Sequence, residues 1–123
     1  MATVNPTITD ISNGNGQVKK VTWALTSANA DGAPLGPQFA EYADRTVYVL
    51  GTWGGATAVI QGGDGSTWLS LTDPQGNAIS KSADAIEVVT EMPEYTRPYL
   101  STPGAGATLT VTMIMRRGFR RSA

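Results

Sequence analysis

The chain has 123 residues, the length of a single domain, with 15% charged residues and a formal net charge of −1. It contains no cysteine and no histidine, which excludes disulfides and thiol chemistry and removes the commonest general base and metal ligand. The small net charge points to neither nucleic acid nor a membrane, and no apolar run approaches the ~20 residues of a membrane-spanning helix. The first residues lack the basic and apolar regions of a secretory signal.

Alternating polar and apolar residues predict strands near the start of the chain. An extended segment covers residues 7–11, and a turn rich in glycine and asparagine follows it. Residues 18–26 predict a strand with three large apolar side chains on one face: Val21, Trp23 and Leu25. Residues 1–17 are expected to form an amino-terminal arm ahead of this strand.

A long loop is predicted over residues 27–44, which contain several prolines and glycines. Residues 38–42 are compatible with one helical turn that places Phe39 and Tyr42 on the same side. Two interpretations follow. The aromatic pair anchors a lid over an open end of the domain, which is the commoner role of such pairs, or it forms a contact arm for a neighbouring subunit.

The central stretch, residues 45–73, gives the strongest indication of the fold class. Its β-branched and aromatic runs are separated by glycine-rich turns, which supply the positive φ angles that hairpin turns need. We therefore expect three antiparallel strands in one meander, over residues 46–50, 56–61 and 67–72. Trp53 lies at the tip of the first turn, where it either packs on its own loop or contacts a partner.

Further strands are predicted in the second half, over residues 78–80, 85–91 and 95–101. Pro98 interrupts the last of these, and because proline cannot donate to a ladder, we expect an edge strand there. Residues 108–116 give the clearest strand pattern, with four side chains facing the core: Leu109, Val111, Met113 and Met115.

The fold class predicted from this pattern is all-β. Eight or nine strands at spacings of about ten residues indicate a single domain over residues 1–123, a two-sheet antiparallel β-sandwich of the jelly-roll type. Trp23 and Trp68 are expected in its core.

No catalytic or metal-binding pattern is present. Glu87 and Glu91 share one face of a predicted strand and are expected to face solvent, and the turns at Asp64 and Asp73 are ordinary turn sequences. The sequence therefore predicts neither an enzyme nor a cofactor nor a metal site.

The basic tail, residues 117–123, follows Arg116 and carries the main charge cluster of the chain. Three interpretations stay open: a solvated tail, docking on an acidic protein surface, and, least favoured, binding to nucleic acid. The residues concerned are Arg117, Phe119, Arg120 and Arg121.

From Arg45 onward the chain resembles small virion proteins of tailed bacteriophages that decorate or cement the head. The resemblance rests on ADRTV, GTWGGA, the Gly62–Trp68 turn with the following LTD, GN, YTRP and the strand that ends at Arg117. The pattern of a glycine, an Asp-Gly turn and a tryptophan is also similar to jelly-roll modules of the galactose-binding type. The first 44 residues lie outside the match.

This resemblance implies a non-catalytic β-sandwich on the outer capsid surface of a virion. Its partners would be the major capsid protein and further copies of itself, as a dimer or trimer. Phe39, Tyr42, Trp53 and the tail residues are the expected subunit contacts. Alternative functions are a carbohydrate-binding jelly-roll module and a structural component of the tail or baseplate.

Overall fold

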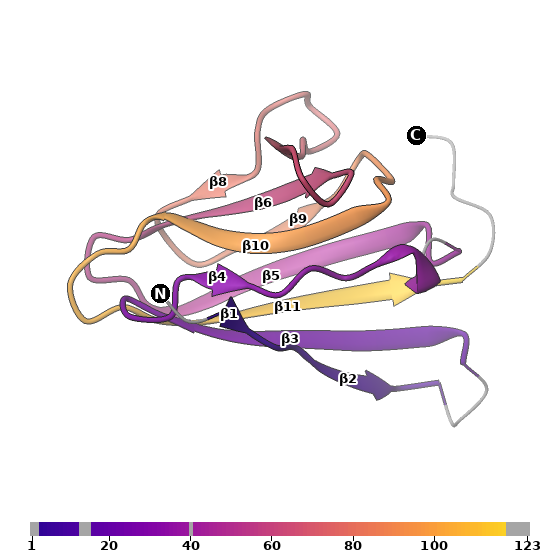
Figure 1. The fold of residues 1–123 in the computed structure, drawn as a ribbon, viewed down its shortest axis with the longest axis horizontal. Coiled ribbons are helices and arrows are strands. Elements are labelled where there is room, and N and C mark those ends of the chain that lie inside the picture. Colours follow the sequence, from indigo (N-terminus) through magenta and orange to yellow (C-terminus); the bar gives the residue numbers. More distant parts are fainter. Residues whose placement is uncertain (1–2, 13–15, 40, 118–123) are drawn as a thin grey trace.

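The computed structural model describes residues 3–12, 16–39 and 41–117, and these form a β-sandwich (Figure 1). The strands, in chain order, are β1 Thr3–Val4, β2 Thr7–Asp10, β3 Val18–Thr26, β4 Asp31–Gly32, β5 Asp44–Thr52, β6 Thr57–Gly63, β7 Trp68–Ser70, β8 Ser80–Lys81, β9 Ala85–Val88, β10 Tyr95–Thr102 and β11 Thr108–Arg116. Within the described ranges, the only helical element is the 3-10 turn η1, Pro37–Phe39. The all-β prediction is confirmed.

The strands form two sheets with jelly-roll connectivity. Sheet A has the order β1-β4-β10-β6-β7, with β8 also paired to β6, and sheet B has the order β2-β3-β11-β5-β9. From β3 to β6 the chain changes sheet at every connection, and it does so again from β8 to β11. This crossing pairs β3 with β11 at the centre of one sheet and surrounds a common core, as in jelly rolls.

The core lies between the sheets and is supplied by the alternation that the sequence predicted. On β3, Trp23 is fully buried and its indole Nε1 donates to the Ala33 carbonyl at 2.9 Å. On β11, all four predicted side chains are at most 1% exposed. Burial of each such side chain stabilises the fold by roughly 1.5–3 kcal/mol.

The predicted three-stranded meander is wrong in its first half. β6 and β7 pair as expected, but β5 lies in sheet B between β11 and β9, whereas β6 lies in sheet A. Glycines at 54 and 55, with φ of 55° and 84°, reverse the chain, but a reversal does not require the flanking strands to pair. Here it forms a corner between the sheets, and the Ala105 amide donates to the Gly54 carbonyl at 2.9 Å.

Gly54 and Gly55 offer a matched test of this corner. Both have positive φ, so alanine is strained at either position, but a Cβ at Gly54 would lie 2.2 Å from the Ala105 carbonyl oxygen, whereas a Cβ at Gly55 meets nothing within 4 Å. We expect Gly55→Ala to lower the free energy of unfolding by about 1 kcal/mol and Gly54→Ala by about 2–3 kcal/mol. Urea unfolding measures both; equal losses would contradict the close packing of the corner.

Pro98 does not mark a sheet edge, contrary to the prediction. β10 pairs with β6 on one side, and on the other it bonds to β4, Ala30 and Leu35. The missing amide falls between the Thr96 and Leu100 amides, which donate to Leu35 and Ala30. A Cβ on Gly32 would lie 2.6 Å from the proline ring, so a glycine leaves room for the ring inside the sheet.

The amino-terminal segment is integrated into the sandwich rather than extended from it. β1 pairs in parallel with β4 in sheet A, and β2 pairs with β3 in sheet B. The described part of the expected arm therefore belongs to both sheets.

The faces of β9 are also reversed from the prediction. Ile86 and Val88 face outward, 65% and 41% exposed, while Glu87 forms an ion pair with Lys81 of sheet A at 2.6 Å. Glu91 lies beyond the end of β9, so Glu87 and Glu91 do not share a solvent face of one strand.

Candidate interaction surfaces

The aromatic pair of the long loop packs on its own domain. Tyr42 is 5% exposed, its ring centroid lies 6.0 Å from that of Phe39, and its hydroxyl donates to the Gly16 carbonyl at 2.6 Å. Phe39 is partly buried against the core. These contacts favour the lid over the contact arm, and a subunit contact through either ring stays a prediction.

A buried arginine holds this lid in place. Arg45 is 3% exposed; its Nε donates to the Tyr42 carbonyl at 2.8 Å, Nη1 to the Thr96 hydroxyl at 2.9 Å and Nη2 to the Phe39 carbonyl at 3.0 Å. Burial lowers the pKa of Arg45, although a guanidinium stays protonated at neutral pH. This role was not predicted from the sequence, although Arg45 shares the inward parity of Val47 and Val49 on β5.

The basic tail starts beside the lid. Arg117 forms an ion pair with Glu41, which raises the pKa of Arg117, and its guanidinium Cζ lies 5.6 Å from the Tyr42 ring centroid. Phe119, Arg120 and Arg121 lie outside the described residues. Of the predicted contacts, the structure therefore brings together Phe39, Tyr42 and Arg117 at one end of the sandwich.

Trp53 lies at the sheet-crossing corner, away from that group. Its ring is partly buried against the core, and its Nε1 donates to an Asp84 carboxylate oxygen at 2.9 Å. The same oxygen accepts from the Gly51 amide at 3.1 Å. These contacts favour packing of Trp53 within its loop, and a contact of Trp53 with a partner stays a prediction.

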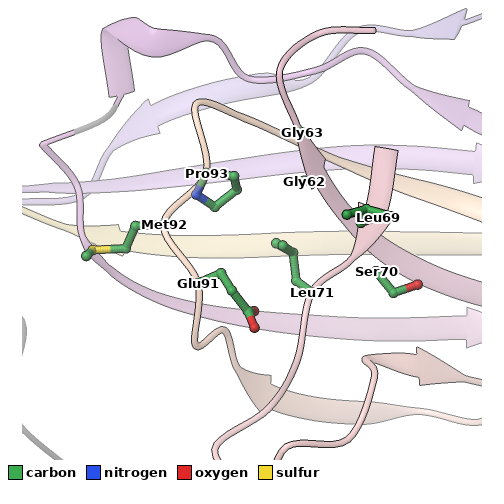
Figure 2. Close-up of a pocket in the computed structure, with 8 residues that line it drawn as sticks. All are labelled: Gly62, Gly63, Leu69, Ser70, Leu71, Glu91, Met92 and Pro93. Atoms are coloured by element: carbon green, nitrogen blue, oxygen red, sulfur yellow. The ribbon is translucent and has the colours of Figure 1, made fainter. Parts of the chain in front are cut away.

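An open cleft of about 450 Å³ lies beside β7 (Figure 2). Leu71 and Pro93 pack over Gly62 at its centre, and Leu69 and Met92 are 70% and 55% exposed. Its one carboxylate, Glu91, accepts bonds from the Thr72 amide at 2.7 Å and from the Thr72 hydroxyl. The cleft is lined by Gly62, Gly63, Leu69, Ser70, Leu71, Glu91, Met92 and Pro93. It offers apolar contact and no pair of free acid and base groups.

The outer face of sheet B carries exposed apolar side chains among threonines. Leu50 is 46% exposed, and Ile86 and Val88 extend the same face on the edge strand β9. Solvated faces of antiparallel sheets are normally polar, so this face is suited to contact with a protein.

The outer face of sheet A carries a cluster of aromatic residues around an arginine. The guanidinium Cζ of Arg97 lies 4.3 Å from the Trp68 ring centroid and 5.1 Å from that of Tyr99. Trp68 is only partly buried and lies on β7 over this face, so its predicted place in the core is wrong. β7 is a short edge strand, and its pairing places Trp68 opposite Gly63, on the face of sheet A that also carries Tyr95 and Arg97.

Across the described ranges, no group of three potential metal ligands is present, and no helix is long and apolar enough to cross a membrane. No family model matches the chain, and neither a curated protein nor a solved structure matches it.

Proposed function

We propose that this chain is a non-catalytic structural virion protein that decorates or cements a bacteriophage head. The observation that supports it best is the exposed apolar face of sheet B, with Leu50, Ile86 and Val88 on a rigid sandwich. The resemblance from Arg45 onward points to the same class. A protein that binds only the assembled lattice stabilises that lattice by mass action.

The proposed partners are the major capsid protein and further copies of the chain, as a dimer or trimer, on the outer capsid surface. A role in the tail or baseplate is the related alternative, since it would use the same kind of protein contact.

Binding to purified heads tests the proposal. Undecorated heads of the phage that carries this gene are mixed with the purified protein and sedimented. We expect saturable binding and a higher melting temperature of the decorated heads. Binding to isolated tails but not to heads would move the protein to the tail, and no binding to either would overturn the proposal.

The tail provides a sharper prediction within this assay. Deletion of residues 118–123 should leave the melting temperature of the isolated domain unchanged and weaken binding to heads. The remaining binding should be less sensitive to salt, because arginine–carboxylate pairs at a surface are screened at high ionic strength. Unchanged affinity and unchanged salt dependence would exclude the tail as a contact and leave the loop around Phe39 as the candidate.

A carbohydrate-binding module is the second candidate function, favoured by the rings of Trp68 and Tyr99 on an open sheet face. Arg97 already covers part of these rings, which leaves less of them for stacking on a sugar. Titration with a panel of neutral oligosaccharides, followed by tryptophan fluorescence, tests this candidate directly.

A further inference from the structure

Three neighbours hold Arg97 in one orientation. The residue lies in the middle of β10, with its side chain on the outer face of sheet A, opposite Gln61 of β6. Its guanidinium stacks on Trp68 and Tyr99, and its Nε donates to Gln61 Oε1 at 2.9 Å. Two rings and one hydrogen bond therefore fix the plane of the guanidinium.

The opposite end of this guanidinium has unused donors. Within the described ranges, neither Nη1 nor Nη2 of Arg97 has a hydrogen-bond or ion-pair partner. Two parallel N–H groups on a planar fork match the two oxygens of a carboxylate. Because the side chain is already ordered, binding such a group costs little further side-chain entropy.

We propose that Arg97, held by Trp68, Tyr99 and Gln61, is a binding hot spot for an aspartate or glutamate side chain on a partner protein. Tryptophan, tyrosine and arginine are the residues enriched in such hot spots. A nucleic acid would require several cations, whereas the strand pairing places an acidic residue, Asp31, opposite Tyr99 on this sheet. This inference rests on the proposed function only in one respect: the proposed function says that the partner protein is part of a phage head.

The first experiment needs no particle. Blocked tripeptides Ac-Gly-Glu-Gly-NH2 and Ac-Gly-Gln-Gly-NH2 are titrated into the full chain, and NMR follows the Arg97 side-chain resonances and the Trp68 indole. We expect saturable shifts with the glutamate peptide alone. The shifts should vanish in Arg97→Gln. They should weaken in Arg97→Lys, which keeps the positive charge but lacks the two parallel N–H groups of the guanidinium. Arg116→Gln, an exposed arginine on sheet B, serves as the control and should retain the shifts.

The peptide titration can contradict the proposal in two ways. Equal shifts with both peptides, or glutamate-dependent shifts that survive Arg97→Gln, would overturn the proposal. Amide spectra of each variant show whether the fold is retained, and Arg97→Lys provides a second test if Arg97→Gln fails to fold.

The second experiment uses heads. Arg97→Gln should weaken head binding about 30-fold, whereas Arg116→Gln should change it less than about threefold. Unchanged binding of Arg97→Gln to heads that wild-type protein decorates would overturn the role of Arg97 at the interface. If wild-type protein binds no head, the proposed function fails, and the peptide titration alone decides the carboxylate site.

Discussion

Met113→Asp should leave the chain unfolded at room temperature. Met113 is 1% exposed at the centre of sheet B, where it pairs with Val21 of β3 and Val47 of β5. A carboxylate there has no partner, and its lost hydration costs several kcal/mol, in addition to the lost apolar burial. Since whole domains are stable by only about 5–15 kcal/mol, this one change can remove the folded state.

Near-ultraviolet circular dichroism and amide NMR dispersion measure the loss. The control is Thr110→Asp, on the same strand but exposed on the outer face, which should cost about 1 kcal/mol through lower β-propensity. Similar melting temperatures for the two variants would show that the assigned faces of β11 are wrong.

Arg45→Met should lower the free energy of unfolding by about 3–5 kcal/mol. It removes the donors that Arg45 supplies to the Tyr42 carbonyl and the Thr96 hydroxyl, and a buried polar group left without a partner costs roughly 1–3 kcal/mol. The Phe39 carbonyl is affected less, because it also accepts from the Tyr42 amide. Arg45→Lys should not rescue, since one ammonium cannot span three acceptors placed around a planar fork.

Urea unfolding gives the overall loss, and hydrogen exchange locates it. The Tyr42 amide, which bonds to the Phe39 carbonyl, should lose protection more than amides of β11. Arg116→Met, on an exposed arginine of the same sheet, is the control and should cost less than about 0.5 kcal/mol. A loss of that size for Arg45→Met would contradict its role as the anchor of the lid.

The alternation of polar and apolar residues correctly predicted the strands whose two faces differ most in polarity. β3 and β11 have the predicted bounds, because one face of each is apolar and lies on the core. The opposite face of β11 was harder to predict. Thr112 is only 7% exposed, since Thr22 and Tyr48 flank it on the neighbouring strands, so an aspartate there should cost more than at Thr110.

The predictions from the sequence were wrong where pairing between segments distant in the sequence decides the structure. A glycine turn after β5 reverses the chain whether the next strand joins the same sheet or the opposite one. Pro98 is tolerated inside a sheet only because Gly32, distant in the sequence, leaves space for its ring. Arg45 and Arg97 each acquire their roles from partners about 35 to 50 residues away, such as Thr96 and Gln61. No local pattern contains that information.

The place of β11 in sheet B has a consequence for how the protein is made. β11 lies between β3 and β5, so two strands that leave the ribosome early have no hydrogen-bonding partner on their facing edges until the last described strand emerges. Such non-local pairing slows folding to the millisecond-to-second range and exposes open edges meanwhile. Nascent chains should therefore remain sensitive to proteases until β11 is released, and then become resistant in one step.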